Sequence, residues 1–475
     1  MTRKLVLIAM LAATACSMDP KMAQPELAVP PSWPVGDAYL RQSEAALPAL
    51  TYRDIFRDMR LQKLIDLALA NNRDLRVAAA NIAAARAQYQ IQRASQLPRI
   101  DLGGGASYSD SGSATGANAN GGGSPGGRAG YSADIGINAF EIDLFGRLAS
   151  LSRADQNRYF ATESAARATR LTLVGDIADA WLTYAADASL LQIAQDTVVS
   201  AGRSVGLTRA RLQGGVAPRS DLRQAEQVLA TAQADVAQQR TALAQDINAL
   251  QLLVGAPVDP ALLSPSIDEA AATVADLPAG LDSRILLRRP DVVQAEYQLR
   301  AANAEIGAAR AALFPTISLT GAFGFASNAP SALFTGGAFG WSGGGSAAYP
   351  LFRAGAGRAG VALSEAQRDA ALATYERAIQ SAFRETADAL ARRGTIDEQL
   401  RANGLQAAAA ADSYRLADAR YRGGVEGFLS SLDAQRSLYA AQRTLIATRL
   451  IGGSNRVGLY RALGGDRALD DTGPR

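Results

Sequence analysis

The chain has 475 residues, of which 48% are hydrophobic, and a formal net charge of +3 at pH 7 from 48 basic and 45 acidic side chains. It contains no histidine and a single cysteine, Cys16. These counts exclude disulfides within the chain, metal sites built from His and Cys, and every catalytic mechanism that needs histidine. Because the charges are interspersed, without a basic block, we expect no nucleic-acid partner.

The N-terminus has the pattern of an export signal. Two basic residues are followed by an apolar run, Leu5–Leu11, and then by small residues that end at Cys16. The segment resembles a bacterial lipoprotein box, with Ala13 where leucine is usual. We therefore predict a signal peptide over residues 1–15 and acylation of Cys16, with sorting to the outer membrane because Ser17 and not Asp follows. The alternative is a plain signal peptide with an incidental cysteine.

Residues 16–60 follow the expected signal peptide. Six prolines fall between positions 20 and 48, and proline neither continues a helix nor donates a hydrogen bond in a central strand. We therefore predict an extended tether that joins the acyl anchor to the body of the protein. The body begins with a proline-free stretch, Leu61–Ser95, which we expect to be helical and to end at an alternating strand, Leu97–Leu102.

Four stretches alternate with the period of two that β-strands have, near residues 99–110, 130–144, 316–326 and 340–352. Each is long enough to cross a bilayer as a tilted strand. Aromatic residues lie near the strand ends, at Tyr131, Phe140, Trp341, Tyr349 and Phe352. Four strands cannot close a barrel, and open strand edges are not tolerated in lipid. We therefore expect an oligomer in which three copies supply twelve strands; the alternative is a soluble four-stranded sheet packed on helices.

The stretch from Leu148 to Ala217 contains no proline, and a helix of that length would reach roughly 100 Å. Its apolar residues recur at alternating steps of three and four, with one phase slip after Ala188, as in a coiled-coil seam. Such a helix must lie against several others; the alternative is a series of shorter helices broken at Gly175 or Gly202. The seam positions are Leu171, Val174, Ala178, Trp181, Ala185, Ala188, Leu191, Ala194, Val198, Ala201, Val205, Thr208 and Leu212.

The chain repeats itself. The segment Leu97–Leu102 returns at an offset of 217 residues as Phe314–Leu319, and Arg211–Val216, with its Gly-Gly pair, returns at an offset of 209 residues as Arg420–Val425. This internal duplication predicts two copies of one unit. Each copy is expected to contain a helix, two strands, a very long helix, a Gly-Gly turn and a long returning helix.

One stretch of the second copy carries a family resemblance. Arg288–Leu319, with the sequence RRPDVVQAEYQLRAANAEIGAARAALFPTISL, resembles the signature of TolC-like outer-membrane efflux proteins. More narrowly, it is similar to the lipoprotein branch of OprM-like channels, which serve resistance-nodulation-division (RND) pumps. Glu141–Arg147 matches the family's motif at the end of the second strand, with Phe140 where Trp is usual. Tyr421–Val425 and Asp433–Arg436 match the second hairpin tip.

The resemblance implies a fold, a location and partners. It implies a mainly α-helical protomer with a β part, and a homotrimer that forms a twelve-stranded β-barrel in the outer membrane, a long periplasmic α-helical barrel and an equatorial collar. A periplasmic adaptor and an inner-membrane RND pump are the implied partners, and the protein would be a passive exit duct for drugs or other small toxic compounds. The alternatives are the channel of a type I secretion system, which carries polypeptides, and that of a metal-efflux system.

The duplication and the resemblance together predict the domain order. The first efflux repeat is expected over residues 61–255, an equatorial linker over 256–284, the second repeat over 285–464 and a C-terminal tail over 465–475. No enzymatic activity is expected, and no cofactor apart from the lipid on Cys16. Gly355–Gly360 does match G-x-G-x-x-G, but the chain after it lacks the second strand that a dinucleotide-binding fold needs. A purely structural coiled-coil stalk is the other alternative, against which the duplicated strands and the lipid signal argue.

The Gly-Gly turns between the long helices form the first candidate site. They lie at Gly214, Gly215 and Val216 and at Gly423, Gly424 and Val425. Glycine supplies the backbone freedom that the reversal of a helix needs. In the resembled family these tips meet the adaptor, so we predict docking there; a merely structural turn is the alternative.

The second candidate site is a gate beside the second tip. Leu429 and Asp433 are four residues apart and share a helix face, and Arg436 can pair with Asp433. The first copy has uncharged residues at the matching positions. In the resembled channels these positions form a leucine constriction beside a ring of carboxylates, which a trimer would build from Leu429 and Asp433. The alternative is that Leu429 packs in a helix seam and that Asp433–Arg436 is an ordinary exposed ion pair.

Overall fold

The structure is a computed structural model that describes residues 18–21, 29–30, 51–109, 128–276, 283–464 and 466. The expected signal peptide and the acylation site Cys16 lie outside the described residues, as do most of the tether and of the C-terminal tail. The chain divides into two compact units. The first is formed by Met1–Pro25, Ala83–Ala161 and Glu296–Thr374, and the second by Glu26–Ile82, Thr162–Ala295 and Tyr375–Arg475.

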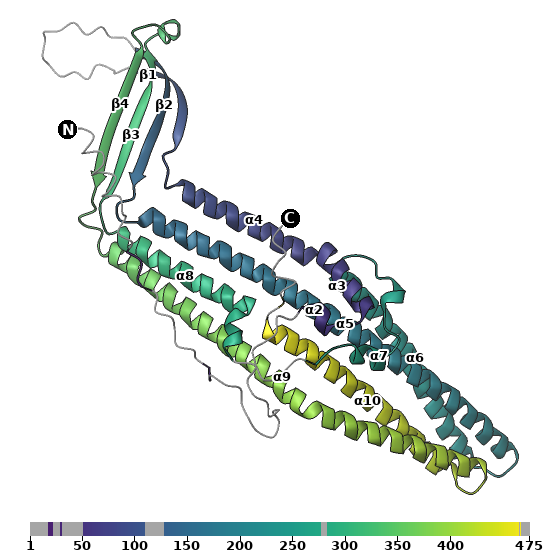
Figure 1. The fold of residues 1–475 in the computed structure, drawn as a ribbon. Helices are drawn as coiled ribbons and strands as arrows, with labels where there is room; N and C mark the ends of the chain where they lie inside the picture. The colour runs from purple at the N-terminus through teal and green to yellow at the C-terminus, as the bar shows by residue number, and fades with distance from the viewer. Residues whose placement is uncertain are drawn as a thin grey trace, which may run out of the picture. The chain divides into compact units, whose positions relative to one another are not determined.

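The two repeats match one another in the order of their elements and in the length of their helices (Figure 1). In each, a helix of 22 residues is followed by two strands, a helix of 67 residues and a returning helix of 36 residues. The first repeat consists of α4 (Arg73–Ala94), β1 (Ile100–Ser109), β2 (Arg128–Ile142), α5 (Arg147–Gln213) and α6 (Arg219–Val254). The second consists of α8 (Pro290–Ala311), β3 (Thr316–Ser327), β4 (Phe339–Ala348), α9 (Ala356–Arg422) and α10 (Phe428–Leu463). The predicted duplication is confirmed.

Short elements complete the described chain. The helices α2 (Tyr52–Ile55) and α3 (Met59–Asn71) precede the first repeat. The 3-10 helices η1 (Pro260–Leu262) and η2 (Ser283–Arg288) and the helix α7 (Ile267–Ala272) connect the repeats, and η3 (Pro330–Ala332) lies between β3 and β4.

The four strands of the first unit form one antiparallel sheet in the order β1-β2-β3-β4 (Figure 1). The strands β1 and β4 are therefore its edges. A bulge interrupts β2 between Ile137 and Phe140, where Ala139 has a φ of 63°. The first three strands begin and end within two residues of the prediction. The fourth ends at Ala348 and not at Phe352, because Pro350 lacks the N–H that a strand ladder needs.

A short junction joins the sheet to α5 in the first unit. The guanidinium of Arg147 donates two hydrogen bonds to the carboxylate of Glu141, at 2.9 and 2.6 Å. The carboxylate of Asp143 accepts a hydrogen bond from the first turn of α5, at 2.8 Å. The rings of Phe145 and Phe314 stack with their centroids 4.7 Å apart, which joins the junction to the end of the second repeat's α8. The motif Glu141–Arg147 therefore holds the point where strand becomes helix.

The stretch Leu61–Ser95 is helical as predicted, but it forms two helices and not one, because the chain breaks at Asn72, between α3 and α4. The side-chain oxygen of Asn72 accepts a hydrogen bond from the N–H of Leu75 (3.0 Å), as a helix N-cap does. Its amide donates to the carbonyl of Leu253 (2.7 Å), at the end of α6. The break thus depends on a contact with a helix 181 residues away, which the local pattern does not show.

The core of the second unit surrounds the middle of α5. Trp181 is fully buried there and donates a hydrogen bond from its indole to the carbonyl of Leu262 in η1 (2.9 Å). The connection between the repeats is therefore more than a linker. Ile267 in α7 is fully buried in the same core, and Val274 forms an antiparallel bridge with Phe56.

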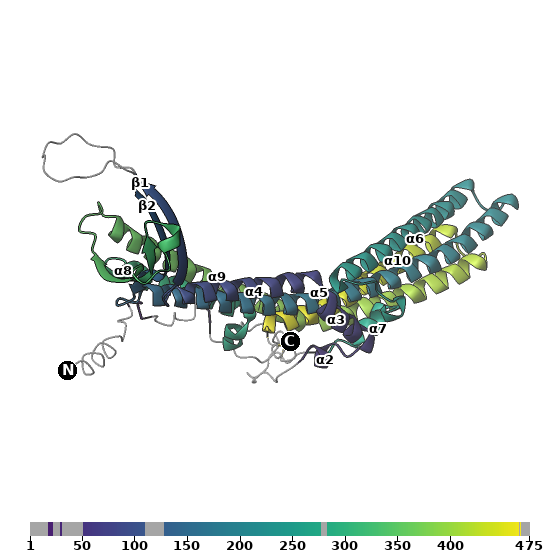
Figure 2. The ribbon, with the colours of Figure 1, turned by 90° about the horizontal axis from the view of Figure 1, so that it is seen from above.

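The coiled-coil seam predicted on α5 is confirmed, because every position of it is buried or half-buried. The glycines at 175 and 202 do not break the helix, since Arg147–Gln213 is continuous. In Figures 1 and 2 the hairpin end where α5 turns into α6 lies beside the one where α9 turns into α10. Of the helices that the structure describes, none combines the length and the apolar character needed to cross a membrane.

Candidate functional site

The two hairpin tips have the same backbone geometry. At the first tip the N–H groups of Gly215 and Val216 donate to carbonyls in the last turn of α5, at 3.0 and 2.9 Å. Gly424 and Val425 repeat both bonds at the end of α9, at the same distances. This is the Schellman motif, which needs a residue in the left-handed region, and Gly215 and Gly424 have φ values of 76° and 73°.

The first glycine of each pair is not required in the same way. A methyl group on Gly214 or Gly423 would meet nothing closer than 3.4 Å within the described chain. The valines that follow the turns are exposed, Val216 by 77% and Val425 by 71%. Each tip thus presents an apolar side chain on a turn of defined geometry, which suits contact with another protein.

A buried cluster, here called the tip lock, joins the two hairpins just behind the turns. Tyr421 is buried, and its hydroxyl forms a 2.8 Å hydrogen bond with that of Thr208. Its ring packs against Phe428, with centroids 5.4 Å apart, and Leu432 is buried beside them. The guanidinium of Arg211 lies 4.3 Å from the centre of the tyrosine ring and donates to the carbonyl of Tyr421 (2.7 Å). An arginine of the first repeat therefore caps the last turn of α9 in the second.

The structure brings Leu429, Asp433 and Arg436 onto one exposed face of α10. Leu429 is 67% exposed, whereas Leu432 and Gln435 are buried on the opposite face against the other hairpin. Leu429 and Asp433 therefore take no part in the packing of the second unit, whereas Arg436 borders a small pocket beside Gln227 and Tyr439. The expected ion pair is not formed, since among the described residues Asp433 lies within ion-pair distance of no basic group.

Two carboxyl groups meet inside the first hairpin. Burial, and then the charge of Asp187 on α5, raise the pKa of Asp246 on α6 to about 6. Burial also raises the pKa of Asp187. One oxygen of Asp246 is fully buried and has no hydrogen-bond donor among the described residues, so a proton shared with Asp187 would satisfy it. The second repeat has Ile396 and Asn455 at these positions.

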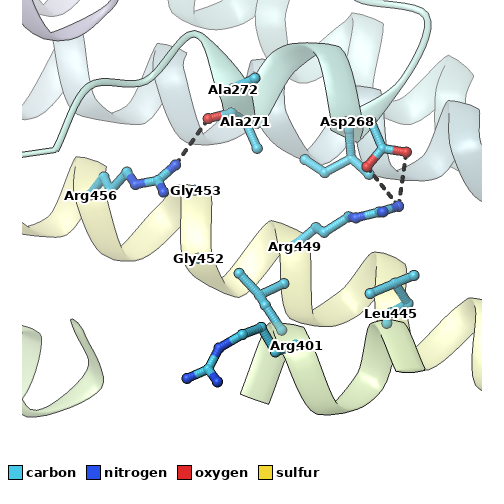
Figure 3. A pocket seen from close by; sticks show the side chains of 12 residues that line it. Asp268, Ala271, Ala272, Arg401, Leu445, Arg449, Gly452, Gly453 and Arg456 are labelled. Atoms are coloured by element: carbon cyan, nitrogen blue, oxygen red, sulfur yellow. Dashed lines mark hydrogen bonds and ion pairs between the residues drawn. The ribbon is translucent and has the colours of Figure 1, made fainter. Parts of the chain in front are cut away.

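A groove of about 390 Å³ lies between α7, α9 and α10 (Figure 3). Apolar side chains and three glycines form much of its lining. Two of its three arginines are engaged, because Arg449 pairs with Asp268 (2.6 Å) and Arg456 donates to the carbonyl of Ala271 (3.0 Å), whereas Arg401 has no such partner among the described residues. Nowhere in the described residues do three or more potential metal ligands cluster. The lining of the groove therefore contains no nucleophilic side chain paired with a base.

The tip lock was not predicted from the sequence. The predicted gate residues are exposed ones after the second turn, whereas buried residues hold the hairpins together. One signal was available: Tyr421 and Phe428 flank the second turn, where the first copy has Leu212 and Arg219. An aromatic pair that replaces an aliphatic and a charged residue indicates a contact that only one copy makes.

Comparisons with known proteins extend over both repeats. The family model described as "Outer membrane efflux protein" matches residues 64–256 and 281–465. The chain is 42% identical, over 98% of its length and 96% of theirs, to two proteins of Pseudomonas putida. These are the antibiotic efflux pump outer membrane protein ArpC and the toluene efflux pump outer membrane protein TtgC. Among solved structures, the open state of the MtrE outer membrane channel of Neisseria gonorrhoeae matches with a TM-score of 0.84 at 34% identity, covering 95% of this chain and 98% of that one.

Proposed function

The chain belongs to the outer membrane efflux protein family, and on that premise we propose that it is the exit duct of a pump that expels organic solvents or antibiotics. The observation that carries the proposal is the similarity over 98% of the chain to proteins named for toluene and antibiotic efflux. A periplasmic adaptor and an inner-membrane RND pump complete the assembly. Because the duct is a passive outer-membrane channel and not an enzyme, the pump selects the substrate.

Complementation tests the substrate class. Expression in a Pseudomonas putida strain that lacks TtgC is expected to restore growth in the presence of toluene or of the exported antibiotics. Failure to restore tolerance to either, with normal amounts of the protein in the outer membrane, would contradict the proposal. Restored secretion of a polypeptide in its place would favour a type I secretion channel.

The open sheet supports a trimer. The edge strands β1 and β4 each have one side without a strand partner in the described chain, and every residue of β4 is exposed. In lipid such edges leave backbone groups without hydrogen bonds. Three copies that join β4 of one to β1 of the next close a twelve-stranded barrel. The mass in mild detergent is expected to be about that of three chains; a monodisperse monomer with the same secondary structure would exclude the arrangement.

The exposed valines support docking of the adaptor at the tips. Replacing Val216 or Val425 by Glu is expected to abolish efflux without lowering the yield of trimers, because a charge cannot enter an apolar contact without a cost. Val216→Leu and Val425→Leu keep the apolar contact and are the matched controls. Unchanged drug resistance in both Glu variants would show that the adaptor does not dock at the tips.

The exposed face of α10 supports the gate. In the trimer, three Leu429 side chains would form an apolar plug and three Asp433 carboxylates a ring that attracts cations. Leu429→Ala with Asp433→Ala is expected to raise single-channel conductance, and Asp433→Lys to shift selectivity toward anions. The matched control is Ser220→Ala with Gln224→Ala, at the same positions of the first copy. Arg436 faces the same side, so Arg436→Ala should change selectivity in the direction opposite to Asp433→Lys.

The lipid anchor rests on the signal-like N-terminus and on Cys16 as the sole cysteine. Incorporation of a palmitate analogue is expected in the parent protein and not in Cys16→Ser. That variant should still assemble, because the strands supply the main anchoring and a lipid chain adds a weaker one. Complete loss of trimers in Cys16→Ser would show that the anchor is required for assembly.

A further inference from the structure

The N-terminal segment Met18–Lys21 is held against the first unit. The carboxylate of Asp19 accepts hydrogen bonds from the hydroxyl of Ser150 (2.7 Å) and from Nε of Arg153 (2.8 Å), and Nη2 of Arg153 lies 2.7 Å from the same carboxylate. Ser150 is fully buried, and its oxygen also accepts from Nη2 of Arg153 (2.9 Å). The side-chain amide of Asn303 donates to the carbonyl of Pro20 (2.9 Å). Groups on α5 and α8 thus hold two consecutive residues.

A glycine makes room for this segment. A methyl group on Gly307 would lie 1.8 Å from a carboxylate oxygen of Asp19 and 2.9 Å from its backbone nitrogen. Any side chain at this position would therefore displace the segment. We call Ser150, Arg153, Asn303 and Gly307 together the N-terminal notch.

The notch residues lie on α5 and α8, and the matching residues of α9 and α4 differ from them. At the matching offsets of 209 and 217 residues, the four notch residues are replaced by Ala359, Ala362, Arg86 and Gln90. The replacements remove the hydroxyl and the guanidinium that bind the carboxylate, and they add a side chain where the glycine leaves space. The side chains that bind the segment are therefore absent from the matching positions of α9 and α4.

We propose that the N-terminal notch is a docking site for the start of the mature chain, and that it holds the acyl anchor beside the sheet. Cys16 lies three residues before Asp19, so their Cα atoms are at most about 11 Å apart. Ser150 lies in the first turn of α5, which follows β2, and Gly307 lies in the last two turns of α8, which precedes β3. Docking therefore keeps the lipid near the end of the sheet, although a proline-rich tether follows the segment. The consequence for the lipid rests on the proposed acylation of Cys16, whereas the docking does not.

Trypsin cleavage after Lys21 tests the docking in the full-length protein in outer-membrane fragments. A protease must bind the chain in an extended form around the scissile bond, so Met18–Lys21 has to leave the notch first. Release of the peptide that ends at Lys21, followed by mass spectrometry, is expected to be at least about tenfold faster in Arg153→Ala and in Gly307→Ala. Gly307→Ala is the sharper variant. It keeps every polar partner and favours the helix, so a folding defect cannot explain faster release.

Arg158→Ala is the matched control, because Arg158 joins the same two helices through Glu305, and among the described ion pairs Asp19 pairs with Arg153 and not with Arg158. Its cleavage rate is expected to equal that of the parent protein. Parent rates in both notch variants, or an equal acceleration in Arg158→Ala, would overturn the docking site. The mass of the released peptide reports acylation separately: an unmodified peptide with the expected rate pattern would refute the lipid anchor and leave the docking intact.

Discussion

The two repeats share one backbone and differ in the side chains that lock it. Among the described residues, each contains three glycines with positive φ, at matching positions 209 residues apart: Gly146, Gly215 and Gly255 in the first, and Gly355, Gly424 and Gly464 in the second. In each repeat, the residue just before the 22-residue helix also donates a hydrogen bond to the end of the 36-residue helix, and we call this contact the closure of the repeat. Asn72 donates to the carbonyl of Leu253 (2.7 Å), and Arg289, its counterpart, donates to the carbonyl of Ala462 (3.1 Å).

The difference shows which features a duplication keeps. The left-handed positions that the two copies share are glycine in both, because other residues would be strained there, whereas Ala139 and Ala354 each have a positive φ in one copy alone. Hydrogen-bonding and charged groups diverge. The neutral Asn72 closes the first repeat, whereas Arg289 closes the second together with Asp291 and Glu385, at 2.8 and 2.9 Å. The same backbone can therefore hold a notch, a gate face or a carboxyl pair in one copy alone.

The tip lock is expected to cause the largest difference in stability between matched variants of the two copies. Tyr421→Ala removes a buried ring and its hydroxyl contact, so we expect the tip to lose about 4 kcal/mol of stability. Leu212→Ala, the matched change in the first copy, removes a half-buried side chain and should cost about 1 kcal/mol. Hydrogen exchange of the tip amides in the assembled protein measures both. Equal protection in the two variants would show that the lock contributes nothing of its own.

The second largest difference is expected in the stability that the two closures contribute. Arg289→Ala is expected to lower stability by about 3 kcal/mol, at the low end for a buried ion pair because both carboxylates stay partly solvated. Asn72→Ala removes a neutral hydrogen bond and should cost about 1 kcal/mol. Thermal unfolding in detergent compares the two. A larger loss in Asn72→Ala would mean that the charge network adds no stability to the second closure.

The carboxyl pair predicts a pH dependence that belongs to the first repeat. The folded-state pKa of Asp246, about 6, lies above the usual carboxyl value, so the folded protein binds a proton that the unfolded chain releases. This contribution to stability is complete below a pH of about 4 and is lost as the pH rises to about 6. Asp246→Asn copies the second repeat. It should raise the melting temperature at pH 7.5 and leave it nearly unchanged at pH 4, and a change of equal size at both values would contradict the shared proton.

The smallest effect should be the same in both copies. Gly215→Ala and Gly424→Ala each place a side chain at a φ above 70°, which is expected to cost about 1 kcal/mol. Gly214→Ala and Gly423→Ala would make only ordinary van der Waals contacts and serve as controls. Hydrogen exchange at the two tips measures all four variants. Clearly unequal costs at Gly215 and Gly424 would mean that the turns are not equivalent.

The sequence by itself determined the features that depend on local periodicity or on repetition. The seam of α5, the strands and the second glycine of each turn follow from the spacing of residue types, because a helix, a strand and a left-handed turn each impose their own pattern. The duplication was visible because its two copies keep the same motifs in the same register. The fold and the positions of the tips were therefore predictable.

Only the tertiary structure decided how distant segments meet. The break at Asn72 depends on Leu253, the tip lock on Arg211 reaching the end of α9, and the N-terminal notch on a glycine in α8. In each case the local sequence permits another structure, such as a continuous helix or an exposed arginine. The choice rests on a carbonyl, a ring or a space that a segment far along the chain supplies. No local pattern records that partner, because the contact exists only once both segments are packed.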